Sequence, residues 1–421
     1  MKISNEILTI GENIENSLEG IFKEIDGIRG KNFLKVLNAF QESQVHDIDF
    51  RDTSGYGYND PGREKVEEVY ARIFGTEAAI VRPQIVSGTH AISTALFGLL
   101  RPGDNLLYIS GEPYETGEGI IGIRKVEGSL ADYGISFDRF DLRDTFEQDK
   151  VGKASVVAIQ RSGGYSFKRS LTIDEIKSAI QKVREIKPGV CIMVDNCYGE
   201  FVQNIEPSEV GADVVVGSLI KNMGGGITPT GGYIAGKEKY IRKIEAMLTA
   251  PGVGREIGPM LGLTRLFLQG VFYAPLVVSN AVKGAVFASK LFGVAGFDVK
   301  PKFNETRSDI VQAIRFDNAE KLITFAQAIQ NSSPVDSDAQ IEPSPLAGYG
   351  NEILMAAGTF VQGSSIELSA DAPMVEPYVA YLQGGIYYEH SKVGSLSALE
   401  ALRAKFGIDI NEINHKLSEQ T

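Results

Sequence analysis

The stretch IMVDNCYGEF (192–201), followed by GADVVVGSLIKNMGGG (211–226) and TGGYIAG (230–236), decides the fold of this 421-residue chain. Each piece contains a short apolar run of the kind that forms a buried strand, and the first run ends in Asp195. Lys221 follows in a glycine-rich loop 26 positions later, which leaves room for one helix-length connection and one strand. We therefore expect both side chains to emerge at the same edge of one sheet.

Similar apolar runs recur between residues 77 and 236, separated by segments with helical spacing. The runs lie at 78–81, 105–109, 156–159, 192–195, 214–216 and 233–235. Strands that are apolar throughout and alternate with helices are typical of a parallel sheet buried on both faces. The sequence therefore predicts an α/β fold with a mostly parallel central sheet flanked by helices, whose ligands bind beyond the carboxyl ends of the strands.

The length exceeds what one ordinary core accommodates, so we expect more than one domain. Residues 1–50 have Leu, Ile and Phe at three- and four-residue intervals and predict an N-terminal helical segment. Residues 51–300 form the predicted large domain, and residues 301–421 form a smaller C-terminal α+β domain. The segment 331–350 is rich in Ser, Pro and Gly and is predicted to be a loop.

The composition is that of a soluble globular protein, with 43% hydrophobic and 23% charged residues. The net charge of −12 and the lack of a basic cluster argue against a nucleic-acid partner. The apolar stretches are short, and the first residues lack a signal peptide's apolar core, so we expect neither a membrane span nor export. Two cysteines predict no disulfide framework and no metal site, as in a cytoplasmic protein.

An amine and a carboxylate that face one pocket are what pyridoxal phosphate (PLP) chemistry requires. The Lys221 amine must lose its proton to bond to the cofactor, so we expect its surroundings to lower its pKa. Asp195 would keep the pyridine nitrogen protonated. Each residue alone has an ordinary explanation, as a surface lysine or a helix-cap carboxylate, but their pairing, with Ser218 three positions before Lys221, favours the cofactor.

The phosphate of such a cofactor needs backbone N–H groups at the start of a helix. The turn Ser87-Gly88-Thr89-His90 follows a predicted strand and precedes the apolar helical segment 92–100. Gly88 would let the backbone approach the phosphate closely. The same kind of turn also caps many helices that bind no ligand, so its value comes from its place before the Asp195 and Lys221 strands.

Three further side chains near strand ends are candidates for cofactor contacts. Tyr114 follows the 105–109 strand and can stack on the pyridine ring, or it packs on neighbouring loop residues. His90 is the competing stacking residue, or a structural histidine. Arg161 ends the 156–159 strand and can contact the ring hydroxyl or a substrate carboxylate, or it forms a salt bridge.

These residues resemble those of the fold-type I PLP enzymes of the cystathionine and methionine lyase group. The chain is more closely similar to the methionine γ-lyase-like family of aluminium-resistance proteins, over nearly its full length. The motifs that carry this resemblance are SGYGYNDPGREKVEEVY, RPQIVSGTHA, GEPYET, QRSGGYS, VDNCYGEFV, GSLIKNMGGG, TGGYIAG, GTFVQGSSIELSADAP and YLQGGIYYEH. The pair VDNCYGEF and GSLIKN is the most specific.

The resemblance implies a fold-type I PLP-dependent transferase-like fold and a role for each matching residue. It implies that Lys221 is the Schiff-base lysine, that Asp195 is the pyridinium partner and that Tyr114 is the stacking ring. The implied phosphate contacts are Gly88, Thr89 and Ser218. In the wider group a tyrosine-containing segment reaches the neighbouring subunit's phosphate, and Tyr56 and Tyr58 hold the similar place, which implies a homo-oligomer with shared active sites.

The sequence departs from the family pattern at three places. The wider group has an arginine just after the first tyrosine, where this chain has Gly57 and Tyr58. The closer family commonly has arginines at the places of Gly163 and Val375. If either arginine binds the substrate carboxylate in the family, the substrate or the activity differs here. Three other arginines could bind the carboxylate instead: Arg161, Arg255 and Arg307.

The resemblance favours a carbon–sulfur lyase that acts on a sulfur-containing amino acid of the methionine or cystathionine type, by β- or γ-elimination. One alternative is another PLP reaction on an amino acid, such as that of an aldolase or an aminotransferase, because loops rather than fold choose the bond that breaks. A second is a catalytically altered PLP-binding protein of stress tolerance. An α/β protein without a cofactor would leave the coincidence of Asp195, Ser218, Lys221 and the 87–90 turn unexplained.

Overall fold

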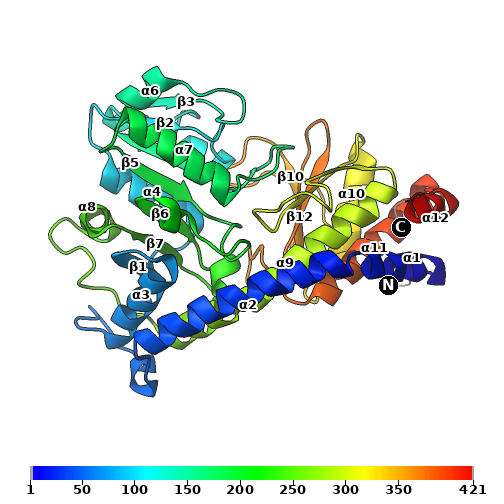
Figure 1. The fold of residues 1–421 in the computed structure, drawn as a ribbon, viewed down its shortest axis with the longest axis horizontal. Coiled ribbons are helices and arrows are strands. Elements are labelled where there is room, and N and C mark those ends of the chain that lie inside the picture. Colours follow the sequence, from blue (N-terminus) through cyan, green and yellow to red (C-terminus); the bar gives the residue numbers. More distant parts are fainter. Residues whose placement is uncertain (1–2, 420–421) are drawn as a thin grey trace.

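Short β-branched runs build a seven-stranded sheet in the computed structural model, which describes residues 3–419 (Figure 1). The strands are β1 (Ala78–Arg82), β2 (Asn105–Tyr108), β3 (Ser136–Arg139), β4 (Val156–Gln160), β5 (Cys191–Asp195), β6 (Val214–Ser218) and β7 (Gly232–Gly236). Their spatial order is β1-β7-β6-β5-β4-β2-β3. β7 runs antiparallel to both of its neighbours and all other pairs are parallel, which confirms the mostly parallel sheet.

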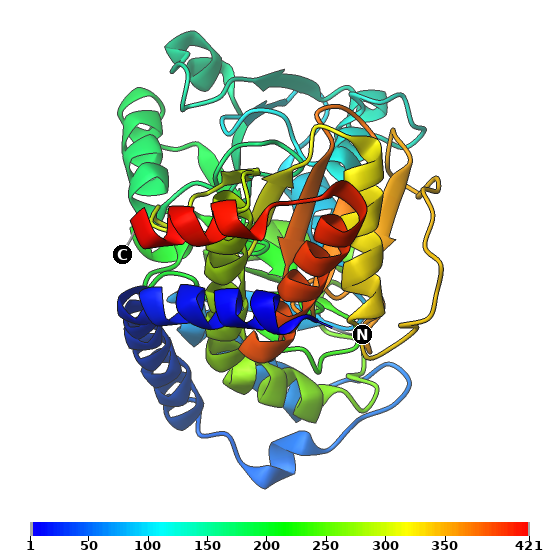
Figure 2. The same cartoon turned by 90° about the vertical axis from the view of Figure 1, so that its right-hand side faces the viewer.

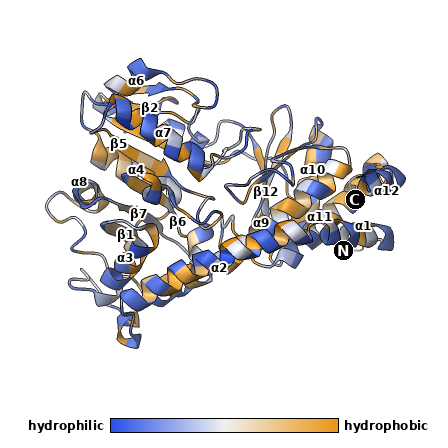
Figure 3. Ribbon diagram, in the orientation of Figure 1, coloured by the Kyte–Doolittle hydropathy of each residue, from blue (hydrophilic) through white to orange (hydrophobic). Residues whose placement is uncertain are grey.

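Helices cover both faces of this sheet, as its uninterrupted apolar strands predict. On one face, Ile80 and Ile234 share a core with α4 (Gly88–Leu99) and α8 (Glu238–Leu248). The other core contains residues of α3 (Pro61–Phe74), α7 (Ile173–Ile186) and α9 (Thr264–Val294). Two short helices complete this part, α5 (Glu115–Ile121) and α6 (Gln148–Lys153). In Figure 3 the strand β5 is largely hydrophobic, whereas α6 and α7 turn hydrophilic residues outward.

Local capping fixes where the helices beside the strand ends begin. Ser87 is the N-cap of α4, and its Oγ accepts a hydrogen bond from the His90 N–H at 3.1 Å. Thr172 and Glu175 form a reciprocal capping box at the start of α7. The α4 cap matters for function because it holds the first turn of this helix at the carboxyl edge of the sheet.

A second sheet of five antiparallel strands lies in the C-terminal part of the chain (Figure 1). Its strands, in spatial order, are β10 (Ile353–Ala356), β11 (Ser369–Pro373), β12 (Val379–Gln383), β9 (Gln312–Arg315) and β8 (Asp298–Lys300). The helices of this part are α10 (Ala319–Asn331), α11 (Tyr388–Phe406) and α12 (Ile410–Glu419). This sheet with its helices confirms the C-terminal α+β region, while the exact limits 1–50, 51–300 and 301–421 stay a prediction.

The N-terminal segment forms two helices, α1 (Asn5–Ser17) and α2 (Glu19–Glu42), as its spacing predicts. They divide between the two parts of the molecule (Figures 1 and 2). α2 packs along α9, whereas α1 packs on α11. The Ser4 hydroxyl donates to Glu400 at 2.5 Å and Lys392 pairs with Glu15 at 2.5 Å, so the start of the chain is fastened to its C-terminal region.

Helix α9 corrects the expectation that no apolar stretch approaches the length of a membrane span. With 31 residues it is long and apolar enough to cross a membrane by length and composition. However, 72% of its most apolar window is buried inside the fold, where the helix packs against α2, α3 and α11. In this structure α9 is a core helix that connects the two sheets.

Candidate active site

The structure brings Asp195 and Lys221, both half-buried, close together at the carboxyl edge of the large sheet. Asp195 ends β5, and β6 beside it ends at Ser218, from which the chain turns into the Lys221 loop. The Lys221 Nζ lies 3.9 Å from the centroid of the Tyr198 ring, a favourable cation–π distance. Lys221 and Asp195 are close enough to shift each other's pKa.

The charges of this pocket correct one expectation about Lys221. Burial acts to lower the pKa of the amine, but Cys197, Tyr198 and Asp195 raise it, and the net direction is upward. The surrounding groups therefore favour the ammonium form of Lys221, whereas we expected them to lower its pKa. Burial raises the pKa of Asp195, opposed by Lys221 and by the Cys197 N–H, which donates to Asp195 Oδ1 at 3.1 Å.

The first turn of α4 meets the ends of β5 and β6. A Cβ added at Gly88 would lie 3.1 Å from the Cys197 Sγ and 3.2 Å from the Ser218 Cβ, so glycine permits this close approach. The N–H groups of Gly88 and Thr89 are the first of the helix and have no intrahelical acceptor. They lie at the positive end of the helix dipole, where an anion is stabilised.

These groups fit PLP by their chemistry. An amine at Lys221 suits the aldehyde, a carboxylate at Asp195 suits the pyridine nitrogen, and the α4 turn with Ser218 suits the phosphate. The Gly88 contacts show that the turn lies against the same two strand ends that carry Asp195 and Ser218.

Tyr114 and His90 lie at the ends of their elements, as expected. The Tyr114 N–H donates to Gln160 Oε1 at 2.7 Å, and its hydroxyl lies 2.7 Å from that of Tyr349. Burial raises the pKa of Tyr114 well above its usual value, and Tyr198 adds to the rise, so Tyr114 stands near the Lys221 pocket. The His90 Nδ1 accepts from the Val86 N–H at 3.3 Å, a local contact that suits the structural alternative for this histidine.

Arg161 occupies a fully buried position behind the edge of the sheet. Its guanidinium donates to Asn196 Oδ1 at 2.8 Å and pairs with Glu206 at 3.5 Å. A Cβ at Gly199 would lie 2.5 Å from the Arg161 Cδ, so the arginine is packed beneath the backbone that follows β5. For Arg161 the sequence offered either a contact with the cofactor or substrate, or a salt bridge. The structure shows the salt bridge, with Glu206.

The two other arginines that could grip a substrate carboxylate also have protein partners. Arg255 pairs with Glu245 at 3.3 Å and with Glu238 at 3.5 Å. Arg307 is buried and donates to the Ala285 carbonyl at 3.2 Å and to Gln312. It lines a separate cavity of about 360 Å³ between α2 and α9.

Tyr56 and Tyr58 are exposed in the single chain, by 67% and 63%. Their rings stack with centroids 5.4 Å apart. The loop that carries them is anchored, since the Gly258 N–H donates to the Tyr56 carbonyl at 2.8 Å and a Cβ at Gly57 would lie 2.7 Å from the Pro259 nitrogen. The loop therefore presents two aromatic rings from a fixed base.

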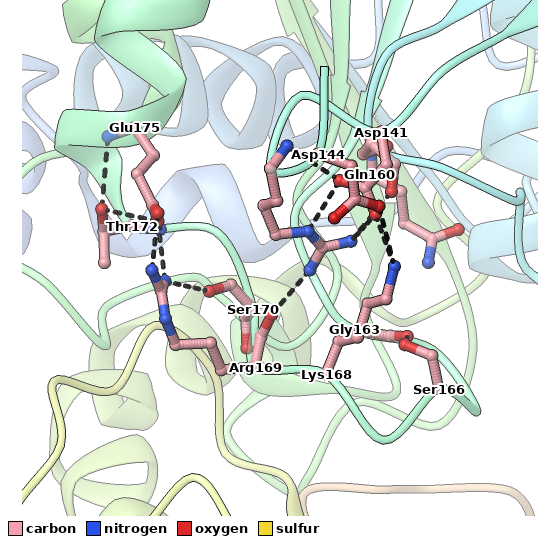
Figure 4. Close-up of polar contacts among 12 residues, drawn as sticks. Asp141, Asp144, Gln160, Gly163, Ser166, Lys168, Arg169, Ser170, Thr172 and Glu175 are labelled. Carbon is pink, nitrogen blue, oxygen red and sulfur yellow. Dashed lines mark hydrogen bonds and ion pairs between the residues drawn. The ribbon is translucent and has the colours of Figure 1, made fainter.

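The loop after β4 contains Gly163, where the family commonly has an arginine (Figure 4). A Cβ at Gly163 would lie 2.5 Å from the Lys168 carbonyl oxygen, so this loop cannot accept a larger residue there without moving. Its own cations have partners, because Lys168 contacts Asp141 at 2.8 Å and Arg169 contacts Glu175 at 2.6 Å (Figure 4). Val375, the other replaced position, is 47% exposed.

The sequence analysis missed a set of residues that the C-terminal sheet brings to the same place. Asp371 on β11 is buried and accepts a hydrogen bond from Gln383 Nε2 at 3.1 Å; burial raises its pKa, and the nearby Lys221 ammonium opposes part of that rise. Tyr165, Tyr349 and Tyr381 lie around it. Tyr198 was also missed, although its position three residues beyond the carboxylate that ends β5 was a signal; it has a left-handed φ of 72°.

No cluster of three or more His, Cys, Asp or Glu residues that could hold a metal ion occurs within residues 3–419. Both cysteines are buried free thiols.

The family model described as methionine gamma-lyase matches residues 7–403 of the chain. An uncharacterized protein of Bacillus subtilis, YnbB, is 48% identical over 401 residues, which cover 93% of this chain and 95% of the relative. The crystal structure of a carbon-sulfur lyase involved in aluminum resistance from Clostridium novyi is 47% identical and has a TM-score of 0.90, covering 94% of this chain and 96% of that chain.

A more distant structure extends the fold comparison. The pyridoxal-5'-phosphate-dependent protein YhfS of Escherichia coli is 18% identical and has a TM-score of 0.57, covering 90% of this chain and 97% of that chain. At this identity the likeness concerns the fold alone. It confirms the expected fold-type I architecture, a mixed, mostly parallel seven-stranded sheet followed by a smaller antiparallel one.

Proposed function

The chain belongs to the methionine gamma-lyase family, and on that premise we propose that it is a PLP-dependent carbon–sulfur lyase. Its substrate would be a sulfur-containing amino acid of the methionine or cystathionine type, cleaved by β- or γ-elimination. The observation that supports this most is the convergence of Lys221, Asp195 and the Gly88 turn on one buried edge of the sheet. The buried free thiols suit a reducing cytoplasm.

Each side chain has a distinct role in this proposal. The Lys221 amine would hold the cofactor's aldehyde carbon and would accept the proton from the substrate Cα as a general base. Asp195 would hold a proton at the ring nitrogen. The N–H groups of Gly88 and Thr89 and the Ser218 hydroxyl would bind the phosphate. Tyr114 covers the ring, with Ser87 and His90 shaping the turn.

PLP, when bound, supplies an electron-accepting ring that stabilises negative charge at the substrate Cα. The Cα–H bond breaks and its proton passes to Lys221 Nζ. For β-elimination the Cβ–S bond then breaks, and sulfur leaves with the bonding electron pair as a thiol after it takes up a proton. Hydrolysis of the remaining unsaturated amino acid yields a keto acid and ammonia, so no oxidant or reductant is needed.

Tyr56 and Tyr58 extend the proposal to the assembly. Two exposed, stacked rings on an anchored loop are suited to a partner surface. We propose that they reach the phosphate side of the active site in a second copy of the chain.

The test is to load the purified chain with PLP and to incubate it with a panel of sulfur amino acids. We expect release of thiol, keto acid and ammonia, and a visible absorbance of lysine-bound PLP. Lys221→Ala should lose that absorbance and the activity together, because the variant lacks the amine assigned to the cofactor. An unchanged absorbance in Lys221→Ala would contradict the assignment of this lysine.

The same experiment separates the alternatives. Stoichiometric transfer of the amino group would indicate an aminotransferase, and cleavage of a carbon–carbon bond would indicate an aldolase. PLP binding without release of ammonia from any member of the panel would favour a binding protein without turnover. Gly163 and Val375 stand where the resemblance implies arginines, and this difference favours the binding protein without turnover as the second candidate.

A further inference from the structure

Asp371 is a buried carboxyl group next to the proposed active site that has no ion-pair partner within residues 3–419. It lies on β11, the middle of the three strands β10, β11 and β12. Its Oδ2 accepts from Gln383 Nε2 at 3.1 Å. The proposed steps at Lys221 make no use of this acid, and burying a carboxyl group without a cationic partner is costly.

Tyrosine rings surround this carboxyl group. The Tyr165 ring lies 5.0 Å from that of Tyr381 and 5.9 Å from that of Tyr349, both stacked, and 5.2 Å from that of Tyr114, edge to face. Asp371 raises the pKa of Tyr165 and that of Tyr114, which places both hydroxyls near the carboxyl group. Aromatic faces around one acid are a favourable environment for an organic cation.

The Tyr165 hydroxyl is buried and has no aligned hydrogen-bond partner among the described residues. It is nevertheless close enough to Asp371 to lower the pKa of that carboxyl, against the rise that burial causes. A ligand with N–H donors would satisfy both the hydroxyl and the acid. The buried hydroxyl is therefore a second polar group beside the acid whose geometry leaves room for a ligand donor.

The space beside these groups has the size of one small polar group. Asp371, Tyr165, Tyr381 and Tyr198 line a cavity of about 30 Å³. That volume suits a water-sized group such as an ammonium. A larger cavity of about 510 Å³ adjoins it and shares Tyr114, Gly163 and Tyr165 with it.

The cavity that contains Asp371 also lies close to Lys221. Tyr198, whose ring lies 3.9 Å below the Lys221 Nζ, lines the same cavity as Asp371. Burial is the main cause that raises the pKa of both Tyr198 and Asp371; Asp371 adds to the rise at Tyr198, and the Lys221 charge opposes the rise at Asp371. A side chain on an amino acid whose Cα is next to Lys221 can therefore reach Asp371.

We propose that Asp371 and its tyrosine surround bind a distal ammonium group on the substrate, so that the enzyme prefers sulfur amino acids that are cationic beyond the sulfur. This inference rests on the proposed lyase function and names its substrate class. Cystathionine-type substrates carry an ammonium group beyond the sulfur, next to a carboxylate, whereas methionine ends in a methyl group.

A matched substrate pair tests the proposal. S-(2-aminoethyl)-L-cysteine and S-propyl-L-cysteine have side chains of equal length, and only the first ends in an ammonium. We expect the holoenzyme to show a kcat/KM at least about tenfold higher for the aminoethyl compound, the size expected of one charge-assisted hydrogen bond. Asp371→Asn should remove that preference, and Tyr165→Phe should reduce it, while exposed Asp338→Asn should keep it.

A binding measurement separates this inference from the lyase proposal. L-lysine and L-2-aminoheptanoate repeat the pair without sulfur, and their Kd values can be read from changes in the visible absorbance of the holoenzyme. If neither sulfur compound is cleaved but L-lysine binds at least about tenfold more tightly, the lyase proposal fails and the Asp371 inference stands. Equal binding of the two compounds by the wild type, or a preference that persists in Asp371→Asn, would overturn the inference. Should Asp371→Asn fail to fold, the wild-type ratio and Tyr165→Phe still decide.

Discussion

Glu200 is a buried acid directly behind the Lys221 pocket. Its Oε1 accepts a hydrogen bond from the Tyr233 hydroxyl at 2.7 Å, and its Oε2 has no hydrogen-bond partner among the described residues. Burial raises the pKa of Glu200 to about 8, and the negative charge of Glu206 adds to the rise. Glu200 therefore keeps its proton at neutral pH and places no extra negative charge behind Lys221.

Glu200→Gln should change how stability depends on pH. The ordinary pKa of a glutamate is 4.5 and that of folded Glu200 is about 8, so between these values only the folded chain holds the proton. Wild-type stability should fall with rising pH across this window, by up to about 1.4 kcal/mol per unit for this one group. The glutamine cannot ionise, so the variant should gain stability relative to the wild type from pH 5 to pH 8.

Urea denaturation at pH 5, 6, 7 and 8 measures this effect. Exposed Glu127→Gln is the control and should follow the wild-type pH dependence. Parallel curves for Glu200→Gln and the wild type would show that Glu200 ionises normally in the folded chain.

At the scale of elements, the Lys221 loop and helix α9 meet backbone to backbone. A Cβ at Gly270 would lie 2.5 Å from the Gly224 carbonyl oxygen, and one at Gly224 would lie 1.7 Å from the Leu219 carbonyl oxygen. At both positions a neighbouring carbonyl oxygen lies so close that only glycine fits. The long core helix thus sets the position of the loop that carries the lysine.

Gly270→Ala should disturb this contact. We expect a loss of stability of roughly 1 to 3 kcal/mol, as for overpacking in a core, and weaker retention of PLP because the loop must shift. Gly27→Ala on α2 is the matched control, since a Cβ there meets nothing within 4 Å, and it should leave PLP binding unchanged and stability equal or higher. Thermal denaturation and the visible absorbance of bound PLP measure both effects. A Gly270→Ala variant as stable as the wild type would contradict this role of α9.

The strands of the large sheet could be predicted from sequence because their signal is local. Apolar runs at 78–81, 156–159 and 214–216 all form strands, and their order along the chain places Asp195 and Lys221 at one edge. The antiparallel direction of β7 could not be predicted, because direction depends on how a connection crosses the sheet. The length of α9 was missed because glycines and Pro275 interrupt its apolar pattern, which tertiary packing overrides.

At the scale of the whole molecule, the site combines the two sheets. Asp371 and Tyr381 come from the antiparallel sheet, and Tyr114 and Tyr165 follow strands of the parallel one. The second set lies more than 200 residues before the first, so no local pattern joins them. The sequence could therefore predict the cofactor half of the site but not the half that faces the substrate side chain.

The association of chains gives a prediction at this scale. If Tyr56 and Tyr58 complete a neighbouring active site, light scattering should give a dimer or a larger assembly. The double variant Tyr56→Ala/Tyr58→Ala should bind PLP at least several-fold more weakly and dissociate more readily, because it loses buried aromatic area. Tyr133→Ala, another tyrosine that is 57% exposed, is the control and should behave as the wild type. A monomeric wild type with full PLP affinity would contradict the proposal that active sites are shared between copies of the chain.

The docking of α1 on α11 has a consequence for synthesis of the chain. Ile7, Ile10 and Ile14 are fully buried in the finished protein, and a Cβ at Gly11 would lie 3.0 Å from the Leu396 Cδ1. Because α1 is synthesised before α11, it lacks the surface of Tyr388–Phe406 until that helix has followed it off the ribosome. Throughout that interval a nascent chain exposes three isoleucines that chaperones can recognise, and closure of this part of the fold must wait for the synthesis of α11.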